Sequence, residues 1–186
     1  LQLRWQAQLV ALASLALVAA YPFMKRITWW PQAWLGLVFS WGVLVGWTQV
    51  HRGENWDVLA AMYLGTVFWV IGYDTIYAHQ DKEDDALVGV RSTARLFGDE
   101  TKSWLVGLYG GALIMFATAY ALAEAPLPAM AGLLAAGAHM ARQIATLDIN
   151  DPAQCLRLFK SNGTVGWLIF AGLIGAGLWA ALKPLI

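Results

Sequence analysis

Acidic residues are concentrated in one stretch of this chain, since five of its twelve Asp and Glu residues lie within positions 73–85. We predict that the apolar helix entering from Val58 continues through this stretch, and one helical face then repeats at i+3, i+4 and i+7. The residues on that face are Asp74, Tyr77 or Ala78, Asp81 and Asp85. Like charges four residues apart repel each other in a helix, and a divalent cation would offset the repulsion. Hard carboxylate oxygens suit Mg²⁺, which usually takes one or two carboxylates together with substrate phosphates.

A simpler interpretation of the acidic face is a solvated loop that keeps charge out of a bilayer. Two features favour a functional site instead. Asp74 lies in the last turn of an apolar segment, where an ionisable side chain is costly and usually functional. The stretch is also strongly acidic, whereas cytoplasmic loops of membrane proteins are enriched in Lys and Arg.

The composition indicates that a membrane-embedded protein positions these residues. Hydrophobic residues make up 59% of the chain and charged residues 13%, against about 25% charged residues in soluble domains. Eleven Trp and six Tyr residues suit the aromatic belts at membrane interfaces. The net charge is zero, so no basic surface indicates nucleic-acid binding. The single Cys155 can form no disulfide within the chain.

Six apolar stretches approach the roughly 20 residues that a helix needs to cross a bilayer. We expect an all-α bundle of transmembrane helices that forms one domain over residues 1–186. The expected spans are Gln6–Met24, Ala33–Gln49, Val58–Ala78, Trp104–Ala123, Ala129–Leu147 and Thr164–Leu182. The apolar run of the first span ends early, at Pro22. The pairs Gly42-x-x-x-Gly46 and Gly107-x-x-x-Gly111 predict close helix packing.

The cationic residues are unequally divided between the two ends of these spans. Nine of the twelve Lys and Arg residues fall on the side of the acidic face, and the other three are Arg4, Arg52 and Lys183. The positive-inside rule therefore places the acidic face in the cytoplasm, where diphosphates and Mg²⁺ are available.

A longer motif contains the acidic face. It reads Asp74-x-x-Tyr77-Ala78-x-x-Asp81-x-x-x-Asp85, followed by Gly89-Val90-Arg91-Ser92-Thr93-Ala94. This motif resembles the second aspartate-rich motif of the UbiA superfamily of intramembrane prenyltransferases, and it is most similar to the bacterial 4-hydroxybenzoate branch of that family. Residues 147–151 and 155–162 resemble the same branch, and we assign them no role.

The resemblance implies an activity for the intact protein. That activity is the Mg²⁺-dependent transfer of a polyprenyl group from polyprenyl diphosphate to 4-hydroxybenzoate, which gives 3-polyprenyl-4-hydroxybenzoate in ubiquinone biosynthesis. Asp81 and Asp85 would bind Mg²⁺–diphosphate, and Asp74 would orient the aromatic acceptor or join the metal shell. Tyr77 would stack near the allylic cation or donate a hydrogen bond, with plain packing as an equal alternative. The implied location is the bacterial cell inner membrane, with several passes through it.

Two cationic residues are candidates for binding the diphosphate. Lys25, in the run Tyr21-Pro22-Phe23-Met24-Lys25-Arg26, resembles a family cation that faces the diphosphate, and we favour it over Arg26. A topogenic anchor at the membrane interface is the alternative for this pair. Arg91 has a guanidinium group that suits diphosphate or carboxylate oxygens. Ser92 is predicted to cap the helix that follows.

The chain departs from the family pattern in one respect. UbiA enzymes resemble one another in carrying two aspartate-rich motifs on about nine helices, and the first motif has the form N-D-x-x-D. This sequence contains no such motif. We therefore expect it to be the C-terminal part of an enzyme, with six of nine spans, and to be inactive alone.

Other functions remain open at the level of the sequence. Another UbiA-type enzyme would act on homogentisate, a chlorophyllide or haem. A six-helix transporter or cation channel would use Asp74 as an intramembrane relay, but charge gathers at one interface here while the span interiors are nearly free of it. His79 is expected to be a helix-end residue, and His139 and Arg142 either line the cavity or reach to the interface. Asp148 and Asp151 are expected to be solvated or to cap a helix.

Overall fold

Six long helices dominate the computed structural model, which describes residues 2–50 and 53–182. His51, Arg52 and Lys183 lie outside the described residues. The long helices are α1 (Trp5–Ile27), α2 (Pro31–Val50), α3 (Trp56–Ala78), α6 (Thr101–Leu122), α7 (Leu127–Thr146) and α9 (Asn162–Leu182). The short elements are α4 (Lys82–Val88), α5 (Thr93–Phe97), a 3₁₀ turn (Gly98–Glu100) and α8 (Pro152–Lys160).

The predicted multi-pass helical architecture is confirmed. Five helical segments are long and apolar enough to cross a membrane, and they contain α1, α2, α3, α6 and α9. The sixth long helix, α7, has 20 residues, as α2 has. One boundary differs from expectation, because α1 continues past the expected Met24 to Ile27, with Pro22 inside the helix. Proline removes one helical hydrogen bond, and that loss does not end the helix here.

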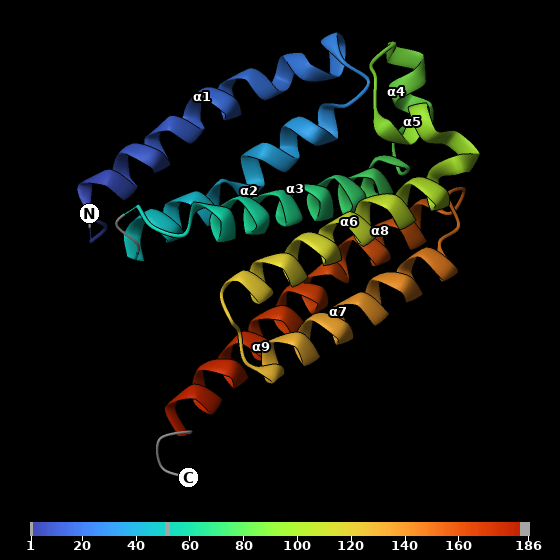
Figure 1. Cartoon of the computed structure of the whole chain (residues 1–186). Helices are drawn as coiled ribbons and strands as arrows, with labels where there is room; N and C mark the ends of the chain where they lie inside the picture. The colour runs from blue at the N-terminus through green and yellow to red at the C-terminus, as the bar shows by residue number, and fades with distance from the viewer. Residues whose placement is uncertain (1, 51–52, 183–186) are drawn as a thin grey trace.

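The six long helices pack in chain order, and the last of them, α9, also returns to α3, where Trp69 donates to Asn162 Oδ1 at 2.9 Å (Figure 1). Each packs on the next, α1 on α2, α2 on α3, α3 on α6, α6 on α7 and α7 on α9. The short helices α4 and α5 lie at the end of the bundle where α1 and α3 end. The start of α1 and the end of α9 lie at the opposite end, as six long helices that alternate in direction require.

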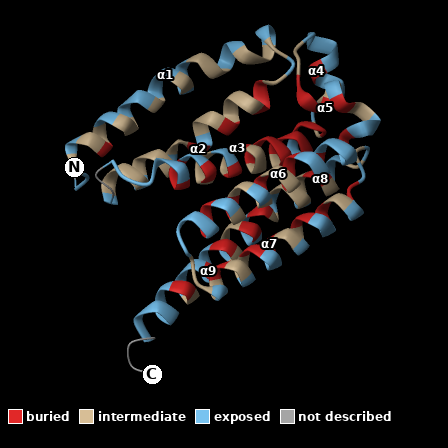
Figure 2. Ribbon diagram, viewed as in Figure 1, coloured by how far each residue is buried: buried red, intermediate tan, exposed pale blue. Residues whose placement is uncertain are grey.

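The core is centred on α3 and α6, where buried residues are densest (Figure 2). Ile76 of α3 packs there with Leu105, Tyr109 and Phe116 of α6, all of them at most 2% exposed. Gly72 makes room for the Tyr109 ring, since a Cβ at Gly72 would clash with a carbon of that ring. The end of α3 is therefore held rigidly against α6.

The glycine pairs do not pack as predicted. Among the residues that the structure describes, nothing lies within 4 Å of a Cβ added at Gly42, Gly46 or Gly107, and only Gly111 of the two pairs meets a neighbour, the ring of Phe68 at 3.4 Å. Backbones instead approach each other closely between α7 and α9, where a Cβ on Gly132 would lie 2.7 Å from the Cα of Gly172. The spacing of two glycines on one helix predicts a smooth surface but not which surface meets a partner.

Candidate functional site

The acidic stretch is divided by a turn, so the prediction of one continuous helix through Asp85 is wrong. Helix α3 ends at Ala78, and α4 begins at Lys82. The amide of His79 donates to the carbonyl of Ile76 and that of Gln80 to the carbonyl of Tyr77. These bonds span three residues, and such tightening is common where an α-helix ends. His79 is the C-cap residue, which confirms the prediction of a helix-end position.

The turn still leaves Asp81 and Asp85 one helical turn apart. Asp81 is the N-cap residue of α4, and its carbonyl accepts a hydrogen bond of 2.7 Å from the amide of Asp85. Asp81 is exposed, while Asp85 is only 8% exposed. Glu83 and Asp84 are exposed in the same helix. The D-x-x-x-D pair thus has one solvated and one buried carboxylate.

Lys25 of α1 is the counter-charge of the buried carboxylates. Its Nζ lies 3.3 Å from Oδ1 of Asp85, and it also interacts electrostatically with Asp74. Asp74 is 9% exposed near the end of α3. Tyr21, one turn before Lys25, lies close enough to interact with both aspartates. The structure therefore brings three predicted residues, Lys25, Asp74 and Asp85, to one place.

Asp85 has an oxygen that the protein leaves unsatisfied. Its Oδ2 is buried and has no hydrogen-bond partner among the described residues. A buried anionic oxygen is costly unless it is paired or coordinates a cation. Residues 2–50 and 53–182 contain no group of three or more His, Cys, Asp or Glu residues that could hold a metal ion. Mg²⁺ usually needs only one or two carboxylates when a phosphate supplies further oxygens, so Asp81 and Asp85 fit this ion.

Tyr77 packs against α8 and keeps part of its surface exposed. Its ring centroid lies 4.7 Å from that of Phe159, which also contacts Tyr73 at 5.6 Å. Tyr77 is 38% exposed. An aromatic surface therefore adjoins Asp74 on α3, and the packing alternative for Tyr77 holds alongside any functional role.

Arg91 contacts the end of α1 and the loop that follows it. Its Nη1 donates to the carbonyl of Ile27 at 2.8 Å, and its backbone amide donates to the carbonyl of Lys25 at 2.8 Å. The guanidinium carbon lies 5.6 Å from the ring centroid of Trp29. The predicted cap on the following helix is confirmed, because Ser92 Oγ accepts from the amide of Arg95.

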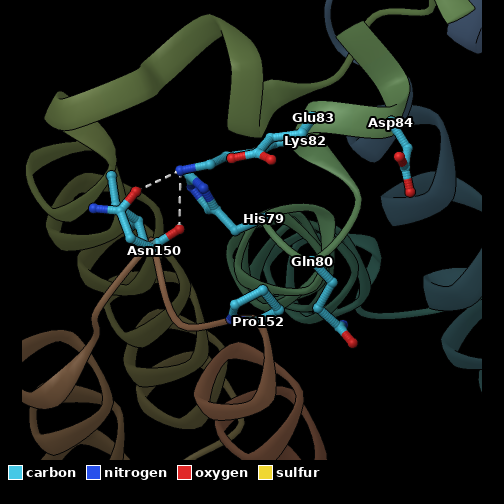
Figure 3. Close-up of a pocket in the computed structure, with 8 residues that line it drawn as sticks. His79, Gln80, Lys82, Glu83, Asp84, Asn150 and Pro152 are labelled. Atoms are coloured by element: carbon cyan, nitrogen blue, oxygen red, sulfur yellow. Dashed lines mark hydrogen bonds between the residues drawn. The ribbon is translucent and has the colours of Figure 1, made fainter. Parts of the chain in front are cut away.

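A small polar pocket of about 170 Å³ lies where α3 gives way to α4 (Figure 3). Lys82 reaches across it and donates to the carbonyl of Ile149 at 3.1 Å and to Oδ1 of Asn150 at 2.7 Å. Lys82 thereby ties the start of α4 to the loop between α7 and α8. The sequence suggests only a role in membrane topology for Lys82. The structure adds a local contact between two segments of the chain.

His79 lies on the wall of the same pocket with its ring buried. Its Nε2 lies 3.0 Å from Oγ1 of Thr101, and that hydroxyl donates to the carbonyl of Gly98. Thr101 therefore accepts from His79, and the neutral ring carries its proton on Nε2. Burial first, and then the charge of Lys82, lower the pKa of His79 from 6.5 to about 4.

The lowered pKa of His79 predicts that acid destabilises the protein. Between pH 6.5 and 4 the unfolded chain binds a proton that the folded protein does not, so stability present above pH 6.5 is lost as the pH falls. The loss by pH 5 is roughly 2 kcal/mol. We expect the melting temperature in nanodiscs to fall less between pH 7.5 and 5 in His79→Gln than in the unsubstituted protein. An equal fall in both would contradict this assignment.

The polar residues near α8 are structural. His139 Nε2 lies 3.2 Å from Ser161 Oγ, which also accepts from Gln143 at 2.7 Å. Asp151 caps α8 by accepting from the amide of Gln154, and Asp148 accepts from the amide of Asn150. The prediction that these aspartates cap or lie solvated is confirmed. Arg142 is exposed.

Sequence reasoning missed three contributors to the site. Tyr21 had a usable signal, because it lies four residues before Lys25 and so on the same helical face. Trp29 and Phe159 had none, since their partners come from segments at least 62 residues away in the chain, as in the pairing of Trp29 with Arg91.

The fold and the site together define a multi-pass helical membrane protein with a partly buried acidic site near one end of its helices. Residues 1–169 match the model of the UbiA prenyltransferase family. The chain belongs to this family, as the motif around Asp74, Asp81 and Asp85 indicated. No solved structure matches it.

Several relatives are similar to nearly the whole chain. It is 47% identical over 169 residues to the mitochondrial 4-hydroxybenzoate polyprenyltransferase of Bos taurus. The aligned residues make up 91% of this chain and 46% of that protein. The human protein of the same name is 45% identical over 170 residues, which are 91% of this chain and 46% of the human protein. The protein of that name from Arabidopsis thaliana is 45% identical over 174 residues, which are 94% of this chain and 43% of the plant protein. The chain thus spans about half the length of the curated relatives it matches.

Proposed function

We propose that the protein containing this chain transfers a polyprenyl group from polyprenyl diphosphate to the ring of 4-hydroxybenzoate. The observation that carries the proposal is the grouping of Lys25, Asp74 and Asp85 at one end of the helical bundle, in a chain of this family. Identity of 45–47% to enzymes named for this reaction supports the choice of acceptor. We further propose a bacterial inner membrane as its location, with the acidic site on the cytoplasmic side.

The charges of the site suit the departure of diphosphate from an allylic carbon. Asp81 and Asp85 would hold Mg²⁺, which when bound supplies positive charge to the leaving group. Lys25 adds a second positive charge beside Asp85 and stabilises the negative charge that develops on the diphosphate oxygens. Its three ammonium protons allow it to donate to Asp85 and to a substrate oxygen at once.

Other residues serve the carbon side of the reaction. The faces of Tyr73, Tyr77 and Phe159 can stabilise an allylic cation, because an aromatic ring attracts positive charge over its face. Asp74 lies on the same helix as Tyr73 and Tyr77, and its carboxylate can accept the hydroxyl proton of the acceptor ring and so orient it. The apolar layer around them excludes water, which would otherwise capture the cation.

Prenyl transfer by purified protein tests this proposal. We expect the complete reading frame that encodes this chain, in nanodiscs with polyprenyl diphosphate, Mg²⁺ and 4-hydroxybenzoate, to form 3-polyprenyl-4-hydroxybenzoate. Excess chelator should reduce the rate to background, and added Mg²⁺ should restore it. A parallel reaction with homogentisate in place of 4-hydroxybenzoate shows which of the two rings accepts the polyprenyl group. Product from homogentisate alone would replace the proposed acceptor, and undiminished turnover with chelator would exclude the metal.

A further inference from the structure

Two arginines share one tryptophan ring at the end of α1. The guanidinium carbons of Arg91 and Arg95 lie 5.6 Å and 5.4 Å from the ring centroid of Trp29, which belongs to the loop between α1 and α2. Cations within about 6 Å of an indole face are attracted to it. The two like charges also repel each other, so the arrangement requires further bonds that hold each arginine in place.

Arg91 is held by the last turn of α1. Its amide and its Nη1 donate to the carbonyls of Lys25 and Ile27, both at 2.8 Å. Carbonyls in the last turn of a helix have no partner within the helix, so these two bonds satisfy groups that would otherwise need water. Arg91 thereby fixes the backbone of Lys25, whose ammonium reaches Asp85.

Arg95 is held by the end of α4. Its Nη1 donates to the carbonyls of Asp85 and Val90. The carbonyl of Asp85 also accepts from the amide of Val90 at 3.0 Å. Arg95 thereby fixes the backbone of Asp85, whereas Arg91 fixes that of Lys25, the other partner of the ion pair.

We propose that Trp29, Arg91 and Arg95 form a clamp that positions Lys25 against Asp85. Lysine has a long and flexible side chain, so the 3.3 Å contact between Nζ and Oδ1 depends on how the two backbones are held. Each arginine holds one of these backbones, and the Trp29 ring joins the two arginines. The three are positioning residues for the diphosphate end of the site, a role that rests on the function proposed above.

Hydrogen exchange tests the clamp without substrate or metal. In metal-free nanodiscs, we expect Trp29→Leu to speed amide exchange about tenfold in peptides covering residues 22–30 and 83–92. Trp29→Phe keeps an aromatic face and should restore most of the protection. Trp41→Leu is the control, because its indole also joins α1 and α2, by donating to the carbonyl of Val10, but contacts neither arginine. Exchange in Trp29→Leu equal to that of the unsubstituted protein would overturn the clamp.

Steady-state kinetics tests what the clamp positions. We expect Trp29→Leu to raise the KM for polyprenyl diphosphate about tenfold and to leave the KM for the aromatic acceptor within twofold, while Trp29→Phe recovers most of the loss. Faster exchange with an unchanged KM for the diphosphate would show that the clamp does not serve the site. Absence of turnover in the unsubstituted protein would refute the proposed function, whereas the exchange result would still decide whether the clamp exists.

Discussion

Asp85→Asn should reduce kcat/KM for polyprenyl diphosphate by about 10³-fold, which corresponds to about 4 kcal/mol of lost transition-state stabilisation. The carboxylate is 8% exposed, and its Oδ2 has no partner among the residues that the structure describes. Asparagine keeps the shape of the side chain and removes the anionic oxygen that a cation would bind. The loss should therefore appear in catalysis rather than in folding. The measurement is initial rate against diphosphate concentration at saturating Mg²⁺.

Asp84→Asn is the matched control for this substitution. Asp84 precedes Asp85 in α4 and is exposed, so the change removes one negative charge from the same helix without altering the ion pair of Lys25 with Asp85. We expect its kcat/KM to stay within about threefold of the unsubstituted value, because exposed charges are strongly screened. Equal losses in Asp84→Asn and Asp85→Asn would mean that net charge on α4, not a defined ligand, supports the reaction.

The part of the fold that follows from hydropathy could be read from the sequence. Six apolar stretches of sufficient length predicted the six long helices, because a bilayer leaves the backbone few alternatives to a helix. The break between Ala78 and Lys82 could not be read in the same way. It depends on Lys82 bonding to Asn150 and on His79 bonding to Thr101, and no helical periodicity records contacts with distant segments.

The sequence allowed individual residues of the site to be predicted, but it did not show which of them lie together. Asp74, Asp85 and Lys25 were identified individually, and the structure places them together. Asp81 turned out exposed, since the turn before α4 moves it off the buried face. Arg91 was identified by its charge, but its partners lie in the last turn of α1 and in the loop after it, 64 residues earlier in the case of Ile27. A guanidinium group suits backbone carbonyls and aromatic faces as well as phosphates, so its chemistry alone does not select a partner.

Lys25→Met should raise the KM for polyprenyl diphosphate by about 100-fold, because a hydrogen bond to a charged group contributes about 1.5–3 kcal/mol. The substitution keeps the length of the side chain and removes only the ammonium that lies 3.3 Å from Asp85. Lys25→Arg retains the positive charge and should recover a large part of the affinity. Titration of rate against diphosphate at saturating acceptor gives the KM in each case.

Arg26→Met separates this local role from a general effect of charge near the membrane. Arg26 is the next residue and is exposed. Its replacement by Met therefore removes the same charge from the same end of α1 as Lys25→Met does. If the cation pair acts only as a topological anchor, both substitutions should lower the amount of correctly inserted protein equally, and neither should change the KM. If Lys25 contacts the diphosphate, only Lys25→Met should raise the KM, since its ammonium is the one paired with the buried carboxylate of Asp85. A larger rise in KM for Arg26→Met than for Lys25→Met would assign the contact to the other cation and would remove Lys25 from the site.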